Sequence, residues 1–263
     1  MSLEALIFDF DGTLADTEET HRQAFNDAFL RFGLKWEWPK PLYRELLKVS
    51  GGKERISRYI GTLPLSLDDK AQLRRLVPAL HRTKTQLYAE LIADGRCPLR
   101  PGVARLFGEA RAAGARLSIV STSASANVDA LLARHLGRSW VWQFHSIVSA
   151  DLVQHKKPAP DIYELALSTL GLPADRCVAF EDSLNGVRAA KAAGLFTVVA
   201  ASQWTLGEDF TGADLELSHL GDAQHPLPPA QAAAVGGPWL GLAELTALHE
   251  EATRESASER ART

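Results

Sequence analysis

The chain has 263 residues, and its 29 Lys and Arg against 32 Asp and Glu give a net charge of −3. This balance argues against nucleic acid as the main partner, because binding to a phosphate backbone requires a clustered basic excess. No apolar run reaches the ~20 residues that span a bilayer, and the first residues lack a leader-like composition. We therefore expect a cytoplasmic protein with no membrane partner. Two cysteines, Cys97 and Cys177, have the spacing of neither a zinc site nor a disulfide framework.

Short apolar runs alternate with helical patterns along most of the chain. The first run, residues 3–10, stops at Asp-Gly-Thr and is typical of a buried central strand in a parallel sheet. Similar runs follow at 116–121, 146–149, 177–180 and 195–200, separated by Ala-rich helical patterns such as 103–113 and 162–170. This alternation predicts an α/β fold with a doubly wound, mostly parallel, Rossmann-like sheet, whose ligands bind beyond the carboxyl ends of the strands.

The alternation is interrupted between residues 16 and 95. Helical periodicity replaces it, with an apolar stripe made by Ala24, Phe25, Ala28, Phe29 and Phe32. Further helices are predicted at 41–48, 53–60, 68–76 and 79–93. An inserted helical block of this kind is typical of a cap over an active site. We expect a catalytic core over 1–15 and 96–225, and a helical cap over 16–95. A Pro/Ala/Gly-rich extension over 226–263 is expected to carry a short helix near 240–251 and a frayed polar tail.

The first candidate site lies where the first strand ends. Asp9 and Asp11 are two residues apart, so in an extended chain their carboxylates point to the same side, and Gly12 permits a sharp exit. Such a pair can bind a hard cation such as Mg²⁺ through oxygen and leave one carboxylate to act as nucleophile or acid. The alternative is that Asp11 only caps the following turn.

Polar residues also follow three later strands. Ser123 ends a run of hydroxyl residues that can bind a phosphate at a helix start, although simple N-caps give the same pattern. Lys157 precedes Pro158, which stiffens the segment and can present the lysine to an anion. Glu181 and Asp182 end the fourth strand and can complete a metal site, or simply favour a helix N-terminus. Because the carboxyl ends of parallel strands meet at one edge, we expect these groups to converge there.

The ordered set resembles a known family. Asp9-Phe10-Asp11-Gly12-Thr13, Ser123, Lys157-Pro158 and Glu181-Asp182-Ser183 are similar to the four motifs of the haloacid dehalogenase superfamily, in its cap-inserted phosphatase and phosphomutase branch, over residues 3 to about 220. The resemblance implies that Asp9 is a nucleophile forming an aspartyl-phosphate, and that Asp11 protonates the leaving group and then activates water. It also implies that Mg²⁺ is held by Asp9, the Asp11 carbonyl and Asp182, helped by Glu181, while Ser123 and Lys157 bind the transferring phosphoryl group.

The cap segment narrows the resemblance. Glycines followed by cations at a helix start, in Ser50-Gly51-Gly52-Lys53-Glu54-Arg55, can bind a second phosphate, although a solvated helix face is the alternative. Together with the nearby 43–47 and 36–38 segments, this one is similar to the CbbY group of xylulose-1,5-bisphosphate phosphatases, which protect Rubisco. The expected substrate-binding residues are Glu18, His21, Ser50, Gly51, Gly52, Lys53, Arg55, Lys84, Thr122 and Asn127.

The expected partner is therefore a small sugar phosphate, and the oligomeric state stays open. The closest rival is a β-phosphoglucomutase, because His21 and Lys84 match positions that those enzymes use in the cap. A phosphoglycolate-type phosphatase fits less well, since the cap cations suit a larger, doubly charged substrate. A binding protein that only kept the fold is a further alternative, but both aspartates, the lysine and the acidic fourth motif are present.

Overall fold

The computed structural model describes residues 3–123 and 125–260. The chain forms two compact units, and each is described by itself. The first contains Met1–Asp16, Leu99–Ser121 and Ser139–Thr263, and the second contains Thr17–Pro98 and Thr122–Arg138. Two boundaries differ from the expected ones. The 122–138 segment groups with the inserted helices because α6 packs on α4, and the C-terminal extension groups with the α/β unit.

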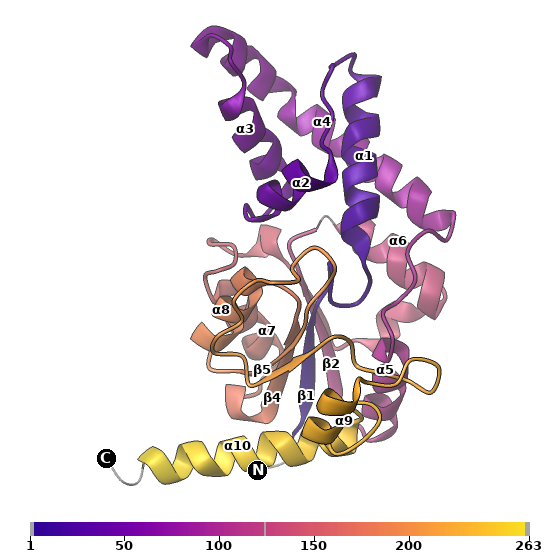
Figure 1. The fold of residues 1–263 in the computed structure, drawn as a ribbon, viewed down its shortest axis with the longest axis vertical. Helices are drawn as coiled ribbons and strands as arrows, with labels where there is room; N and C mark the ends of the chain where they lie inside the picture. Colours follow the sequence, from indigo (N-terminus) through magenta and orange to yellow (C-terminus); the bar gives the residue numbers. More distant parts are fainter. Residues whose placement is uncertain (1–2, 124, 261–263) are drawn as a thin grey trace. The chain divides into compact units, whose positions relative to one another are not determined.

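The first unit is built on a six-stranded parallel sheet, which confirms the predicted fold class (Figure 1). Its strands are β1 (Ala5–Asp9), β2 (Arg116–Ser121), β3 (Ser146–Ser149), β4 (Cys177–Glu181), β5 (Phe196–Ala200) and β6 (Leu215–Leu217). The spatial order is β3-β2-β1-β4-β5-β6, so the chain reverses its winding direction at β1 and β4. Ligands of doubly wound sheets bind at such a reversal point, beyond the carboxyl ends of the strands.

Alternation along β1 decides which way its last side chain points. Ala5 and Ile7 belong to an apolar cluster that also contains residues of α7 and α8. Phe8 lies on the opposite face, where its ring stacks on Phe180 and meets Phe107 edge-on. Side chains two residues apart share a face, so Asp9 continues the face of Ile7 toward α7 and α8.

The helices of this unit are α5 (Val103–Ala112), α7 (Asp161–Leu170), α8 (Leu184–Ala192), α9 (Pro229–Val235) and α10 (Leu242–Arg260). Short 3₁₀ segments lie at Trp140–Gln143, Ala150–Leu152 and Ala174–Arg176.

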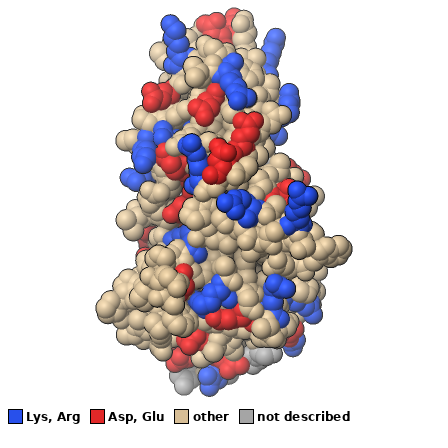
Figure 2. Space-filling view, turned by 90° about the vertical axis from the view of Figure 1, so that its right-hand side faces the viewer, with Lys and Arg blue, Asp and Glu red and all other residues tan. Residues whose placement is uncertain are grey.

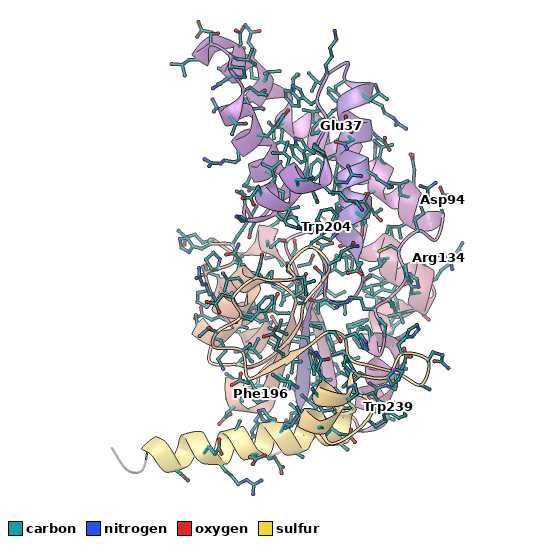
Figure 3. The ribbon with its side chains drawn as sticks, in the orientation of Figure 1. Glu37, Asp94, Arg134, Phe196, Trp204 and Trp239 are labelled. Carbon is teal, nitrogen blue, oxygen red and sulfur yellow. The ribbon has the colours of Figure 1, made fainter. Side chains whose placement is uncertain are left out.

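The C-terminal extension is more ordered than the sequence indicates. The expected frayed tail is wrong as far as residue 260, because α10 continues to Arg260; residues 261–263 lie outside the described part. Ala, Glu and Arg dominate the segment and are strong helix formers, and no Gly or Pro interrupts it. The ring of the buried His249 packs edge-on against Phe196, at the end of the sheet where the strands begin (Figures 1 and 3).

The second unit is helical. It comprises α1 (Thr17–Arg31), α2 (Lys40–Leu47), α3 (Gly52–Thr62), α4 (Leu67–Ala93) and α6 (Ser125–Leu136). Phe25, Phe29, Trp38, Tyr43 and Tyr59 form its aromatic core. The two helices expected at 68–76 and 79–93 are a single helix, α4, with Pro78 inside it. Pro78 is exposed, so the carbonyl that its missing N–H leaves unpaired can bind water instead.

Charge is mixed on the surface. On the face shown in Figure 2, basic and acidic side chains are interspersed, as the net charge suggests. Among the described helices, none combines the length and apolarity that crossing a membrane requires.

Candidate active site

Asp9 is held from two sides at the carboxyl end of β1. Its Oδ1 accepts a hydrogen bond from the Lys157 ammonium group at 2.6 Å, and its Oδ2 accepts one from the Thr13 hydroxyl at 3.2 Å. Both Asp9 and Lys157 are buried. The carboxylate is therefore fixed in orientation before any ligand binds, as a nucleophile requires.

Lys157 also binds Glu181 at the end of β4. Its Nζ lies 2.5 Å from Glu181 Oε1, and that same oxygen accepts a hydrogen bond from the Tyr163 hydroxyl at 2.5 Å. The other oxygen, Oε2, accepts weaker bonds from the Asp182 amide at 3.3 Å and the Ser183 hydroxyl at 3.4 Å. Protein donors thus engage both oxygens of Glu181, and its nearest cation is the lysine.

Asp182 completes the acidic cluster. Its Oδ2 accepts a hydrogen bond from the Thr205 hydroxyl at 3.4 Å. A Cβ atom at Gly12 would lie 2.0 Å from the same oxygen, and Gly12 has a φ of 84°. Both the close approach and the left-handed backbone require glycine at this position.

Burial makes Asp9 and Asp182 hard to ionise. The pKa of Asp9 is raised to about 8, first by burial and then by repulsion from Glu181. Burial also raises the pKa of Asp182 well above its usual value, with Asp9 and Glu181 adding to the effect. Ionising all the carboxylates would create more negative charge than the lysine neutralises, so a bound cation favours their ionised forms.

The residues present fit a divalent cation. One oxygen each from Asp9, Glu181 and Asp182 lies within 4.8 Å of the others, and carboxylate oxygens are the ligands that Mg²⁺ prefers. If metal binding ionises all three carboxylates while Lys157 stays protonated, these four side chains carry two negative charges. The site therefore matches Mg²⁺ in both ligand chemistry and charge.

Arg100 braces the loop that follows β1. The guanidinium group is buried and donates to the carbonyl oxygens of Gly12, Ala200, Ala201 and Ser218, at 2.5 to 2.8 Å. Three loops at the carboxyl edge of the sheet are tied together in this way. This role of Arg100 could not be predicted from the sequence, because an arginine in a Leu-Arg-Pro-Gly turn has no local signal for it.

Asp11 follows β1 in the same unit and is half-buried. Among the residues predicted to act on the phosphoryl group, the first unit thus contains Asp9, Asp11, Lys157, Glu181 and Asp182. Hydrogen bonds or close carboxylate oxygens join four of them, and the charge of Asp11 acts on Asp9. Ser123 and Thr122 belong to the second unit.

In the second unit, His21 joins residues from three segments. Its Nδ1 lies 2.5 Å from Lys84 Nζ and its Nε2 lies 3.4 Å from the Ser123 hydroxyl, which is 3.5 Å from Asn127 Nδ2. Since the ammonium group donates to Nδ1, the ring carries its proton on Nε2 and donates to Ser123. Lys84 is buried against the rings of Phe25 and Tyr88.

A second cluster forms around Glu18. Its Oε2 accepts a 2.6 Å hydrogen bond from the Tyr43 hydroxyl and lies 3.6 Å from Arg55 Nη1. Arg55 also donates to the Val49 carbonyl at 3.0 Å. The predicted binding residues Glu18 and Arg55 are therefore in contact. The Tyr43 hydroxyl orients both, because it donates to Glu18 and accepts from Arg55.

The Gly-Gly-Lys segment begins α3, with Ser50 and Gly51 preceding it and Gly52 and Lys53 in its first turn. A Cβ atom at Gly52 would lie 2.7 Å from Nε2 of His81 on α4, so the glycine gives the histidine room. Burial lowers the pKa of His81 to about 4, with further lowering by the charges of Lys84 and Lys53. This segment therefore concentrates positive potential, as an anion site requires.

The lowered pKa of His81 makes stability depend on pH. An unfolded chain protonates this histidine near pH 6.5, whereas the folded chain resists protonation down to about pH 4. Stability is therefore fully present above pH 6.5 and is lost as pH falls, by about 1–2 kcal/mol between pH 8 and pH 5.

Urea unfolding at the two pH values measures this loss. We expect His81→Gln to reduce the difference by that amount, while the control His145→Gln, at an exposed histidine, follows the wild type. Equal differences for the wild type and His81→Gln would contradict the assignment.

The sequence is similar to a known family of hydrolases over most of its length. The model of the haloacid dehalogenase-like hydrolases matches residues 3–194. The plasmid-borne CbbY protein of Cupriavidus necator is 48% identical over 247 residues, covering 94% of this chain and 97% of that protein. Such coverage includes more than half of residues 226–263, so the C-terminal extension has a counterpart in this relative.

Two solved structures are similar over most of the chain. A crystal structure of CbbY from Rhodobacter sphaeroides with phosphate has a TM-score of 0.76 and 45% identity, and covers 82% of this chain and 94% of that one. An Asp→Asn variant of CbbY from the same organism, in complex with xylulose-1,5-bisphosphate, also has a TM-score of 0.76, with 44% identity and coverage of 84% and 98%.

Proposed function

The chain belongs to the haloacid dehalogenase-like hydrolases, and we propose that it is a Mg²⁺-dependent sugar-bisphosphate phosphatase. It is a phosphatase-type enzyme homologous to CbbY. The proposed reaction converts xylulose-1,5-bisphosphate and water to xylulose 5-phosphate and inorganic phosphate. The observation that carries this proposal is the buried Asp9 carboxylate, fixed by Lys157 within a cluster of three carboxylates.

The first half-reaction transfers the phosphoryl group to Asp9. An Asp9 oxygen forms a bond to phosphorus as the bond from phosphorus to the sugar oxygen breaks, and Asp11 gives its proton to the departing oxygen. Phosphoryl transfer depends mainly on positioning and on neutralising spread negative charge. Lys157, whose pKa is raised by Asp9 and Glu181 despite burial, stays protonated and supplies positive charge beside the nucleophile.

The second half-reaction regenerates the enzyme. Asp11 accepts a proton from water, whose oxygen attacks phosphorus and releases phosphate from Asp9. Asp9 and Asp182, with the Asp11 carbonyl, are proposed to hold Mg²⁺, and Glu181 acts mainly on Lys157 because protein donors engage its oxygens. The ion, when bound, neutralises charge on the transferring oxygens.

The second unit is proposed to bind the other phosphate and the sugar. Lys53 and Arg55 supply charge at the start of α3, and Ser50, Gly51 and Gly52 supply backbone N–H groups. The remaining residues proposed to bind the substrate in this unit are His21, Lys84, Ser123, Thr122 and Asn127. The buried Asn127 Oδ1 has no hydrogen-bond partner among the described residues, which supports a ligand donor for it. The bisphosphate bound by the Rhodobacter sphaeroides relative supports this substrate class.

A comparison of substrates tests the proposal. Phosphate release with Mg²⁺ is measured from xylulose-1,5-bisphosphate, ribulose-1,5-bisphosphate, β-glucose 1-phosphate and phosphoglycolate at equal concentrations. We expect strong preference for the first, consistent with a cytoplasmic role in protecting Rubisco during carbon fixation. The specific alternative is a β-phosphoglucomutase, favoured by the contact of His21 with Lys84. Conversion of β-glucose 1-phosphate to glucose 6-phosphate without phosphate release would establish that alternative.

Replacing Lys53 with Ala separates bisphosphate from monophosphate binding. We expect KM for xylulose-1,5-bisphosphate to rise about 10- to 100-fold, the loss of one charge-assisted phosphate contact. The KM for a small monophosphate such as phosphoglycolate is expected to change less than about threefold, because it lacks the second phosphate. Lys70→Ala, on α4 of the same unit, is the matched control. Equal losses on both substrates would remove the case for a second phosphate site at Lys53.

A further inference from the structure

Tyr163 contacts the catalytic cluster but has no role in the steps above. It lies in α7, six residues after Lys157, and is fully buried. Its hydroxyl donates to Glu181 Oε1 at 2.5 Å, and Lys157 Nζ reaches the same oxygen at 2.5 Å. The ammonium group also lies 5.2 Å from the centre of the Tyr163 ring. One side chain thus contacts both members of the pair that faces Asp9.

The phenol remains a donor under all working conditions. A phenol ordinarily has a pKa of about 10 and keeps its proton at neutral pH. The hydroxyl donates its proton to Glu181 Oε1, which is the acceptor of this hydrogen bond. The contact is therefore directional and points from α7 to the end of β4.

The surroundings of Glu181 leave little space for another orientation. A Cβ atom at Gly186 would lie 1.9 Å from the carboxyl carbon, so α8 approaches the carboxylate with backbone alone. The opposite oxygen, Oε2, contacts the Asp182 amide and the Ser183 hydroxyl. Among the described residues, the donors to Glu181 Oε1 are the Tyr163 hydroxyl and the Lys157 ammonium group.

We propose that Tyr163 is a positioning residue for phosphoryl transfer, whose hydroxyl fixes Glu181 so that the Lys157 ammonium group stays on Asp9. This inference rests on the proposed phosphatase chemistry and extends it to a residue outside the four motifs. Sharing Oε1 between two donors weakens the hold of Glu181 on the lysine. Without the phenol, Oε1 accepts a hydrogen bond from Lys157 alone, and that bond becomes stronger. The ammonium group then shifts from Asp9 toward Glu181.

Tyr163→Phe tests the inference, since it removes one oxygen and keeps the ring. We expect kcat to fall about tenfold at saturating Mg²⁺ and substrate, the effect of about 1.4 kcal/mol on the transition state, with KM changed less than twofold. Tyr59→Phe, at a half-buried tyrosine of the second unit, is the matched control and is expected to keep wild-type kcat. Circular dichroism and melting curves report the folded fraction of each variant.

Three outcomes would overturn the inference. They are an unchanged kcat, a loss of kcat that matches the loss of folded protein, and a loss that additional Mg²⁺ restores, since the last places the effect on the metal. A double mutant gives an independent check. If Tyr163 acts through Glu181, adding Tyr163→Phe to Glu181→Gln lowers kcat less than twofold further, whereas a full tenfold loss would place the action elsewhere.

Failure of the proposed substrate is distinguishable from failure of this inference. The same comparisons are made with p-nitrophenyl phosphate, which requires no sugar recognition. Calorimetric binding of orthovanadate with Mg²⁺ requires no turnover at all, and this ion mimics the transferring phosphoryl group. We expect about tenfold weaker vanadate binding by Tyr163→Phe than by the wild type or Tyr59→Phe. Equal vanadate affinities would contradict the positioning role even if the sugar substrate were wrong.

Discussion

Asp9→Asn is expected to lower kcat by at least about 10³-fold while leaving the fold intact, because an amide oxygen is a poor nucleophile at phosphorus. The substitution is nearly isosteric, and it preserves an oxygen that can accept the Lys157 bond. Phosphate release and melting temperature are measured together. Asp151→Asn, at an exposed aspartate of the same unit, is the control and is expected to keep full activity.

The melting temperature of Asp9→Asn carries information of its own. Burial and the charge of Glu181 raise the pKa of Asp9 to about 8, so the folded metal-free protein keeps a proton that the unfolded chain releases. The free energy of unfolding therefore falls as pH rises from the ordinary pKa of an aspartate to about 8. An amide avoids this cost, and the metal-free variant is expected to melt no lower than the wild type at pH 7. Wild-type turnover by the variant would exclude Asp9 as the nucleophile.

Lys157→Met is expected to reduce both activity and stability. Removing one partner of a buried ion pair costs about 3–5 kcal/mol, because Asp9 and Glu181 lose the cation that binds both of them in a buried site. The pKa of Lys157 is raised, so its contribution is fully present at neutral pH. We expect kcat to fall at least about 100-fold.

The neighbouring residue provides the matched control for this prediction. Lys156 precedes Lys157 directly but is only half-buried. Lys156→Met should keep kcat and melt close to the wild type. If the two methionine variants behaved alike, the choice of Lys157 as the phosphoryl-binding lysine would be wrong.

The positions of the first five strands along the chain could be predicted from the sequence because each is a short apolar run. The sixth, Leu215–Leu217, has only three residues with Glu216 at its centre, and such a segment gives no periodic signal. Two separate helices were predicted on either side of Pro78, because proline usually ends a helix. That prediction fails because an exposed proline can be accommodated in a long helix whose other turns are held by packing.

The candidate site was predictable where its residues follow strands. Asp9 and Glu181 end strands of a parallel sheet, and Asp182 and Lys157 follow strands, so topology brings all four to one edge. The supporting residues were not predictable in this way. Arg100, Tyr163, Tyr43 and His81 lie within turns or helices, and their roles arise from contacts between segments far apart in sequence.

Glycines illustrate the same limit. A Gly next to two aspartates indicates a turn, and Gly12 does take a left-handed conformation. Its second constraint, the closeness of Asp182, depends on the pairing of β1 with β4. Gly186 has an ordinary helical position in the sequence, and its contact with Glu181 becomes visible only in three dimensions.

The most direct test of the central claim is phosphate release from xylulose-1,5-bisphosphate by the wild-type chain and by Asp9→Asn, each with Mg²⁺ and with EDTA. We predict rapid release by the wild type with Mg²⁺, and at least about 10³-fold slower release in the other three conditions. Release that persists in EDTA, or that Asp9→Asn sustains at the wild-type rate, would contradict this prediction.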